Sequence, residues 1–279
     1  MNVVKTGVLL MLLTVLFVFV GSLIGDRSGA VVALLLAVAM NFSALFFGDR
    51  VILAMYRARE LSRHEAPVLF RSIEQLCGKV GLPMPRVYLI PTEAPNAFAT
   101  GRDPAHASVA VTQGILRILS PEELSGVLAH ELAHVRNRDM LVMTVAATVA
   151  GAITFLARMV MWFGSGRENR RENQIGAIGL LLFIVLAPIA AMLIQLAISR
   201  SREYLADDTG ARTVGSGLPL ASALRKLAAG NRAAPMQEGD PATSSLFIVN
   251  PFTAGGLAGL FSTHPPIEER IRRLEAMAV

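Results

Sequence analysis

Long apolar runs alternate with polar blocks along this chain. Two of the runs lie at the N-terminus, Thr6 to Gly25 and Gly29 to Gly48, and only the short charged turn Asp26-Arg27-Ser28 separates them. A helix needs roughly 20 apolar residues to cross a hydrocarbon core of about 30 Å, because backbone groups must be paired inside lipid. The pattern therefore predicts a transmembrane helical hairpin over residues 1–48.

The first run has a second interpretation, a secretory signal peptide, since Lys5 precedes it. Its apolar stretch is longer than the usual signal core of about 7–15 residues, and another run follows almost at once. We therefore expect the first run to be retained as a membrane helix.

Two further apolar runs occur in mid-chain, Met140 to Phe163 and Ile175 to Ile198, joined by the polar segment Gly164 to Gln174. Both are long enough to span a bilayer, and a globular domain rarely needs two apolar helices of this length. We therefore predict four spans in total. The alternative is that one or both of these runs are core or interfacial helices, and Arg158 makes the first of them the weaker candidate.

The polar block before these runs predicts an α+β arrangement. A helix is expected over Pro67–Val80, where apolar residues recur with helical periodicity and Gly81 follows. Three short runs rich in β-branched residues, Arg86–Ile90, Asn96–Thr100 and Ser108–Thr112, are bounded by Pro, Gly and Asp. They predict a small sheet.

Helix signals frame the remaining polar segments. Ser120 is suited to cap a helix, with Pro121 at its first position and acidic residues in its first turn, and this helix should run to about Asn137. Gly230 to Thr263 is expected to form a long loop or flap. Pro266 to Met277 is expected to be a charged helix.

The distribution of basic residues predicts the orientation in the membrane. An even number of spans leaves both termini and both polar blocks, 49–139 and 199–279, on one side. Basic residues flank that side in greater number: Lys5, Arg50, Arg57, Arg59, Arg63, Arg136, Arg138, Arg200 and Arg202. The positive-inside rule places this side in the cytoplasm. The loop with Arg167, Arg170 and Arg171 on the opposite side does not follow the rule.

Composition agrees with a membrane protein and limits the partners. The chain is 53% hydrophobic with a net charge of +5. Much of this charge flanks apolar runs, where anionic headgroups account for it, and no basic helix with interleaved aromatics is present. We expect a lipid bilayer as partner and no nucleic acid. Cys77 is the single cysteine, which excludes an internal disulfide, and we expect it to be a buried residue of the Pro67–Val80 helix.

The run His-Glu-Leu-Ala-His, residues 130–134, carries the clearest chemistry. On a helix, His130 and His134 lie one turn apart on one face, so both imidazoles can bind one zinc ion. Glu131, beside them, can take a proton from a metal-bound water and deliver it to a leaving amine. The alternative is two surface histidines with an unrelated glutamate, which composition makes improbable in a chain with five histidines.

A catalytic zinc ion usually takes a third protein ligand and keeps one position for water. Glu203 is the best candidate, because it follows the fourth apolar run as the histidine motif precedes the third. Asp207 lies one helical turn after Glu203 and could accept the free N–H of a zinc-binding histidine. The alternative is a solvated charged helix with Arg202 and Arg212 as partners.

Three other histidines remain. We expect His64 and His106 to face solvent rather than bind metal. His264 precedes two prolines that would hold its loop rigid. With Arg270, it is a candidate donor to the oxyanion of a tetrahedral intermediate.

The histidine motif, the segment Arg202 to Asp207, the preceding Pro-Asn-Ala-Phe-Ala-Thr-Gly strand and the terminal Ser262 to Ile271 segment together resemble the HtpX-type heat-shock membrane zinc metalloproteases. More distantly they are similar to the type I CAAX prenyl proteases. The resemblance covers nearly the whole chain.

The resemblance implies roles for individual residues. His130, His134 and Glu203 would bind one Zn²⁺ per subunit, and Glu131 would be the general base. Asn96, His264 and Arg270 match positions at the active site of the family, and they would bind the substrate backbone or stabilise the oxyanion. The residue pattern independently predicts a strand over Asn96 to Thr100, and the edge of a strand can bind an extended peptide.

These observations predict a mainly α membrane protein, with four transmembrane helices and a cytoplasmic gluzincin-like α+β zincin domain assembled from two sequence segments. The expected division is a membrane hairpin at 1–48, the first half of the zincin domain at 49–139, two membrane helices at 140–198 and the second half at 199–279.

The expected function is hydrolysis of damaged or misfolded membrane proteins and unfolded polypeptides at the cytoplasmic face of the bacterial inner membrane, in the stress response. The alternatives are a CAAX-type processing protease and a non-catalytic membrane chaperone with a zincin scaffold.

Overall fold

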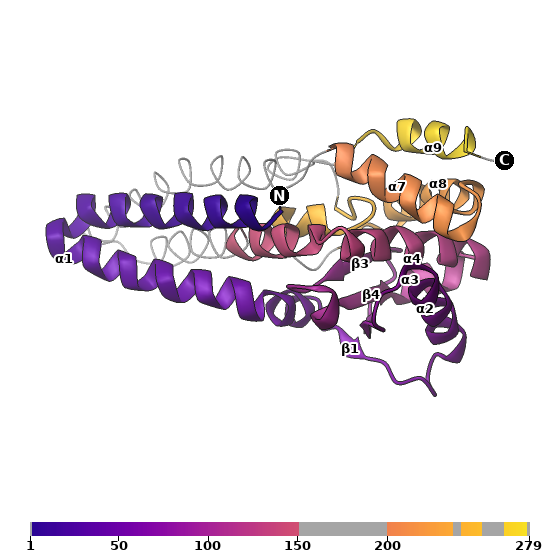
Figure 1. Cartoon of the computed structure of the whole chain (residues 1–279), viewed down its shortest axis with the longest axis horizontal. Coiled ribbons are helices and arrows are strands. Elements are labelled where there is room, and N and C mark those ends of the chain that lie inside the picture. The colour runs from indigo at the N-terminus through magenta and orange to yellow at the C-terminus, as the bar shows by residue number, and fades with distance from the viewer. Residues whose placement is uncertain (1, 151–199, 237–240, 253–264, 278–279) are drawn as a thin grey trace, which may run out of the picture.

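The computed structural model describes residues 2–150, 200–236, 241–252 and 265–277. A long helical hairpin extends from one end of a compact α+β domain (Figure 1). The mid-chain runs beyond residue 150, and the loop between them, lie outside these ranges. Only Asp139–Ala150, an apolar helix, is described from that part of the chain.

The hairpin is formed by α1 (Asn2–Met55), whose direction reverses near Asp26, a residue with a φ of 50°. Two glycines lie where the arms meet. A Cβ on Gly29 would be 2.2 Å from the carbonyl oxygen of Gly21, so the close approach requires glycine. Further along, the amide of Asn41 donates to the hydroxyl of Thr14 across 2.9 Å. The predicted helical hairpin is therefore present.

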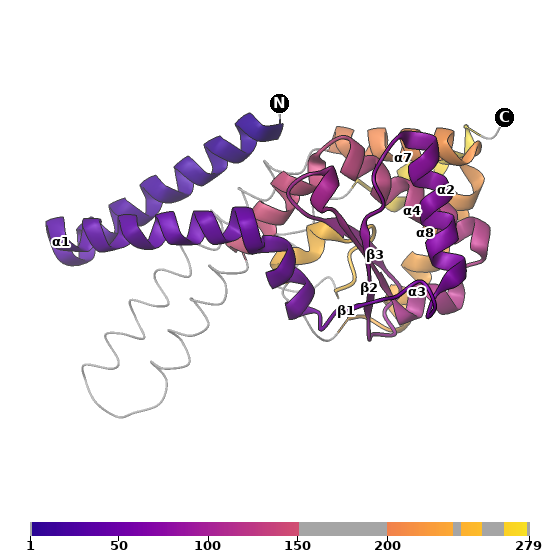
Figure 2. The ribbon, with the colours of Figure 1, turned by 60° about the horizontal axis from the view of Figure 1, so that its bottom comes forward.

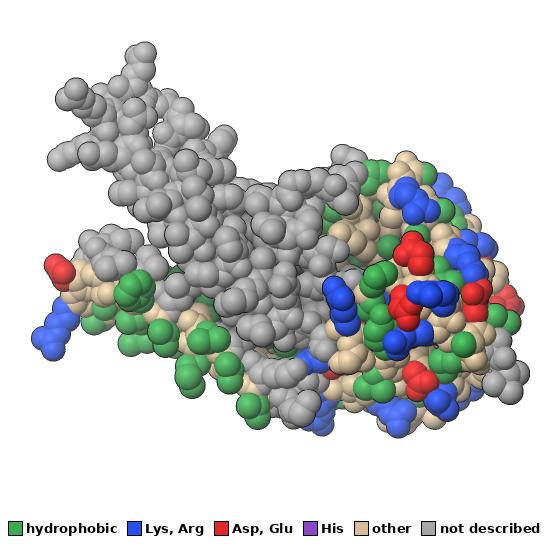
Figure 3. Space-filling view, turned by 90° about the horizontal axis from the view of Figure 1, so that it is seen from above, with side chains coloured by type: hydrophobic (Ala, Val, Ile, Leu, Met, Phe, Trp, Pro, Cys, Tyr) green, Lys and Arg blue, Asp and Glu red, His purple; other side chains and the backbone are tan. Residues whose placement is uncertain are grey.

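The second arm of α1 is the part best suited to a bilayer. Asp26–Met55 is long and apolar enough to cross a membrane, whereas Thr6–Phe19 is a shorter apolar helix. Most of the large apolar side chains of the second arm are exposed, among them Leu35 and Phe42. Figure 3 shows hydrophobic side chains along the hairpin, while charged side chains of both signs cover the domain.

The sheet has four strands in the order β1-β2-β4-β3. These are β1 (Arg59–Glu60), β2 (Arg86–Ile90), β3 (Ala97–Thr100) and β4 (Ser108–Thr112). The central pair β2 and β4 is parallel, and β3 runs antiparallel to β4 at the edge. The three predicted strands are confirmed, whereas β1 was not predicted, because two exposed charged residues carry no strand pattern.

Most helices of the domain lie together on one side of the sheet, and α1 approaches from the other (Figure 2). The helices of the domain are α2 (Pro67–Val80), α3 (Gln113–Ile118), α4 (Pro121–Arg136), α7 (Arg200–Val214), α8 (Leu218–Ala233) and α9 (Ile267–Glu275), with short 3₁₀ turns η1 (Pro104–His106) and η2 (Pro241–Leu246). The predicted α2 is confirmed: Gly81 ends it in the left-handed conformation with a φ of 70°, and Cys77 is buried on it. The C-terminal helix is also present, as α9.

The central helix is α4, which contacts α2, α7, α8 and β3. A capping box between Ser120 and Glu123 fixes its first turn, as the sequence indicated. Gly126 allows α8 to lie against it, since a Cβ there would be 2.8 Å from the backbone nitrogen of Leu220. The histidine motif is thus held on a buried and rigid element.

The segment expected to be a loop or flap is partly packed. Its first residues continue α8, and η2 leads to Phe247 and Ile248, both buried in the core. Phe247 stacks edge to face on Phe98 of β3, with ring centroids 5.1 Å apart. The chain after η2 therefore lies close to the edge strand.

Candidate active site

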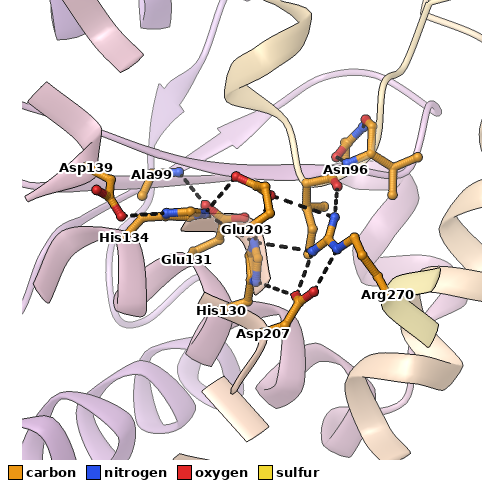
Figure 4. Close-up of polar contacts among 11 residues, drawn as sticks. Asn96, Ala99, His130, Glu131, His134, Asp139, Glu203, Asp207 and Arg270 are labelled. Atoms are coloured by element: carbon orange, nitrogen blue, oxygen red, sulfur yellow. Dashed lines mark hydrogen bonds and ion pairs between the residues drawn. The ribbon is translucent and has the colours of Figure 1, made fainter. Parts of the chain in front are cut away.

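His130 and His134 meet on the face of α4 that packs against α7 (Figure 4). Their Nε2 atoms are 3.2 Å apart, and their rings are perpendicular. Both residues are at most 3% exposed. Two imidazole nitrogens that face each other inside a protein core are suited to share a cation.

A third donor comes from α7. The carboxylate of Glu203 lies 3.8 Å from Nε2 of His130 and 3.6 Å from Nε2 of His134. The three side chains form a cluster whose donor atoms all lie within 4.8 Å of one another. The structure therefore brings together the three residues predicted to bind metal, although residues 137–199 separate the two helices that supply them.

The spacing and chemistry of this cluster fit a zinc ion. Tetrahedral coordination with bonds of about 2.0–2.2 Å places neighbouring ligand atoms about 3.3–3.6 Å apart. The two Nε2 atoms are 3.2 Å apart, and each lies 3.6–3.8 Å from one of the two oxygens of Glu203, so small shifts of the side chains would bring the three donors to these distances. Two imidazoles and one carboxylate are also a common catalytic zinc set.

A glycine sets the distance between the two helices. Glu203, Asp207 and Gly210 are spaced at i, i+4 and i+7, so they share one face of α7. A Cβ on Gly210 would lie 2.9 Å from the backbone nitrogen of His130. Glycine at this position lets α7 approach α4 closely enough for Glu203 to reach the histidines.

Each histidine turns its other nitrogen toward a carboxylate. Oδ1 of Asp207 is 2.9 Å from Nδ1 of His130, and Oδ2 of Asp139 is 3.4 Å from Nδ1 of His134. A carboxylate in this position favours the tautomer that leaves Nε2 free to bind a metal. Asp139 was not predicted, although it follows the motif closely in sequence.

Arg270 of α9 is engaged with these carboxylates. Its guanidinium donates two hydrogen bonds to Asp207, of 2.9 and 2.8 Å, and a third of 2.9 Å to the carbonyl of Ile248. Its Nη1 is 3.8 Å from the carboxylate of Glu203. The side chain is only 1% exposed, so its hydrogen-bonding capacity is directed at protein groups.

Glu131 points to the opposite side of the cluster, toward the sheet. Its carboxylate accepts a 2.8 Å hydrogen bond from the backbone N–H of Ala99 in β3. Burial raises the pKa of Glu131 to about 8, an effect that the nearby positive charges only partly offset. A carboxylate with a raised pKa is suited to exchange a proton near neutral pH.

The pKa values of the partners shift for different reasons. Burial opposes the charged form of His134, but its contacts with Asp139 and Glu203 prevail and raise its pKa to about 9. Burial also opposes the charge on Asp207, but Arg270 lowers the pKa of that carboxyl to about 2. For His130, burial dominates and lowers the pKa. A metal ion that binds here would have to displace the proton that the neighbouring carboxylates favour on His134.

Comparison with known proteins agrees with this geometry. The model of peptidase family M48 matches residues 63–278. The chain belongs to peptidase family M48. It is 55% identical to a protease HtpX homolog of Syntrophobacter fumaroxidans (98% of each chain). It is also 52% identical to one of Pyrococcus furiosus (99% of this chain, 96% of the relative). The resemblance found in the sequence is confirmed, and the chain is a membrane metalloprotease.

The fold is also similar to a solved structure, Ste24p of S. mikatae, with a TM-score of 0.50 and 20% identity. The match covers 86% of this chain and 57% of that one. This likeness concerns the fold alone.

Asn96 lies next to the M48 site, just before β3. Its side chain is buried and donates to the carbonyl of Val249 across 2.5 Å. One residue on, the carbonyl of Ala97 accepts a hydrogen bond from the N–H of Ile248. Asn96 and the edge of β3 therefore already bind backbone groups of the chain itself, those of Ile248 and Val249.

The remaining predicted residues differ in outcome. His64 and His106 are exposed, as expected. His264 lies outside the described residues. Sequence reasoning did not find the N–H of Ala99, Asp139 or Gly210. The N–H of Ala99 belongs to the backbone, so no residue type in the sequence indicates its role. The glycine could have been found by its i+7 spacing from Glu203.

Proposed function

We propose that this M48 peptidase is a zinc-dependent endopeptidase that hydrolyses damaged or misfolded membrane proteins at the cytoplasmic face of the membrane. The observation that carries the proposal is the buried cluster of His130, His134 and Glu203, with Glu131 beside it. A peptidase needs a metal position and a base within reach of one water molecule, and this arrangement supplies both.

Each residue has a distinct task in this proposal. His130, His134 and Glu203 would hold the zinc ion, which when bound lowers the pKa of water and polarises a carbonyl group. Glu131 accepts the proton of the attacking water and returns it to the leaving amine. Asp207 and Asp139 keep the two imidazoles in the orientation that presents Nε2.

Substrate binding would use the edge of β3. An extended peptide pairs with an exposed strand edge through main-chain hydrogen bonds, which gives little sequence preference. Ile248 lies at this edge, so a substrate pairing there would replace its bond to Ala97. Asn96, which already binds a backbone carbonyl, would bind that of the substrate, and His264 is the proposed oxyanion donor.

The contacts of Arg270 favour positioning over direct catalysis. Its bidentate pair with Asp207 fixes the carboxylate that faces His130, and its third bond anchors the Ile248 segment. We therefore assign Arg270 the task of orienting the metal-binding histidine. The oxyanion is left to His264.

Membrane proteins are proposed as substrates because the site belongs to a domain attached to an apolar hairpin. The second arm of α1 exposes large apolar side chains and is long enough to cross a bilayer. Such an anchor keeps the active site near the surface where loops and ends of misassembled membrane proteins emerge. The proposed setting is the bacterial inner membrane in the stress response.

The test is cleavage of casein by the full chain purified in detergent with zinc. Glu131→Gln keeps the shape of the side chain and an acceptor for Ala99, and it should lower the rate by about 10²–10⁴-fold while zinc content stays unchanged. Glu122→Gln, an exposed position on the same helix, is the matched control and should keep full activity. Equal cleavage by the wild type and Glu131→Gln would refute the mechanism.

The same purified protein distinguishes the proposed function from the two alternatives, a CAAX-type processing protease and a non-catalytic scaffold. Cleavage restricted to lipidated CaaX peptides, with casein intact, would instead indicate a prenyl-processing protease. A folded wild type without zinc and without cleavage would indicate a non-catalytic scaffold.

A further inference from the structure

A pocket lies away from the peptidase site, where α1 meets the sheet. Its volume is about 330 Å³, within the range of about 300–1,000 Å³ of small-ligand sites. Three segments line it: the end of the apolar arm of α1, the start of β2, and the loop with η1. The lining residues are Phe42, Phe46, Phe47, Asp49, Arg50, Arg86, Arg102 and His106.

The pocket combines positive charge with aromatic rings. Among the residues that the structure describes, its lining holds three arginines and one carboxylate. The guanidinium carbons of Arg102 and Arg50 lie 5.6 Å from the ring centroids of Phe46 and Phe47, respectively. Stacking of this kind holds a guanidinium over a ring while its N–H groups remain available to an anion.

The arginines are only partly neutralised. Arg86 lies 3.4 Å from Asp49 and its side chain remains 43% exposed, while Arg102 pairs with Asp103 and remains 39% exposed. Asp103 also pairs with His106. Three guanidinium groups thus face two carboxylates, which leaves an excess of positive charge around an open pocket.

The position along α1 places the pocket at the level of lipid headgroups. Ser28 to Gly48 contains no charged residue, and at 1.5 Å per residue it spans about 30 Å, the thickness of a hydrocarbon core. Phe46 and Phe47 therefore lie at the boundary of the apolar layer. Asp49 and Arg50, the first charged residues after it, lie where headgroups begin.

We propose that this pocket binds the headgroup of an anionic glycerophospholipid. The guanidinium groups would bind its phosphate through paired N–H donors, and the phenylalanine rings would contact its glycerol and upper acyl carbons. The excess of arginine favours an anionic headgroup over a zwitterionic one, whose cation would meet further positive charge. Such binding would fix the peptidase domain at the membrane surface.

The test is lipid binding by native mass spectrometry, with the full chain carrying Glu131→Gln so that proteolysis does not interfere. The delipidated protein is titrated with phosphatidylglycerol, or with phosphatidylcholine of the same acyl chains. We expect phosphatidylglycerol to bind at least about tenfold more tightly. The double variant Arg86→Gln/Arg102→Gln should lose that preference.

Two further variants make the result specific. Arg225→Gln/Arg272→Gln removes the same charge from exposed ion pairs on α8 and α9, and it should bind lipid as the parent does. Asp49→Asn removes the carboxylate of the pocket and should tighten phosphatidylglycerol binding. Circular dichroism verifies folding, and Arg50→Gln replaces the double variant if the latter does not fold.

Three results would overturn the proposal. Equal affinity for the two lipids would exclude recognition of the anionic headgroup. Retained preference in the folded pocket variant would place binding elsewhere. Full competition by millimolar inorganic phosphate would assign the pocket to a soluble anion.

Discussion

The metal cluster around His130 and the basic pocket beside α1 both contain arginine and aspartate, but they use them differently. In the cluster, Arg270 is 1% exposed and forms a bidentate pair with Asp207. In the pocket, Arg86 and Arg102 are about 40% exposed, and arginine is in excess. Buried charges that are fully paired fix geometry, whereas exposed and unbalanced ones remain available to a ligand.

The largest expected effect comes from breaking the buried pair. Arg270→Gln leaves Asp207 charged in the core without its cationic partner, with only the His130 imidazole beside it, which should lower the free energy of unfolding by about 3–5 kcal/mol. The midpoint of thermal unfolding, followed by circular dichroism in detergent, should fall by about 10 °C. The same substitution at Arg102 should change the midpoint little, because exposed ion pairs contribute at most about 1 kcal/mol. Equal shifts would contradict the distinction.

A smaller effect is expected from separating α7 from α4. Gly210→Ala places a Cβ against the backbone of His130, at a cost of about 1–3 kcal/mol. It should also weaken zinc binding about tenfold or more, because Glu203 moves with α7. Gly78→Ala on α2 meets nothing within 4 Å, and it should stabilise its helix by up to about 1 kcal/mol. Unchanged zinc affinity in Gly210→Ala would show that helix spacing is not critical.

The smallest effect is expected from salt. Raising NaCl from 0.05 to 0.5 M shortens the Debye length to about 4 Å, so the preference of the pocket for phosphatidylglycerol should fall several-fold. Zinc content, measured in the same samples by atomic absorption, should not change, because the cluster is buried. A salt-dependent loss of zinc would mean that the cluster is open to solvent.

Sequence patterns predicted local features well and tertiary contacts only in part. The cap at Ser120 and the spacing of His130 and His134 are properties of one helix, so α4 and its metal face could be read directly. Predicting Glu203 as a ligand required knowing which two segments meet. The apolar runs between the two helices indicated this, because, as predicted spans, they would return the chain to the same side of the membrane. By contrast, the partnership of Arg270 with Asp207 depends on how α9 packs on α7.

Other features have no local signature at all. The N–H of Ala99 reaches Glu131 only because β3 is an edge strand beside α4. The basic pocket gathers Arg50, Arg86 and Arg102 from three segments, none of which has a motif of its own. Such sites follow from the arrangement of elements, which the order of residues in one segment does not reveal.

The central claim is that two distant helices complete one metal site, and zinc stoichiometry tests it most directly. Purified wild type should hold about one zinc ion per chain after dialysis, and Glu203→Gln should hold far less while remaining folded. Asp208→Asn, an exposed neighbour on α7, should retain the wild-type value. A folded Glu203→Gln variant that keeps one tightly bound zinc ion would contradict the account.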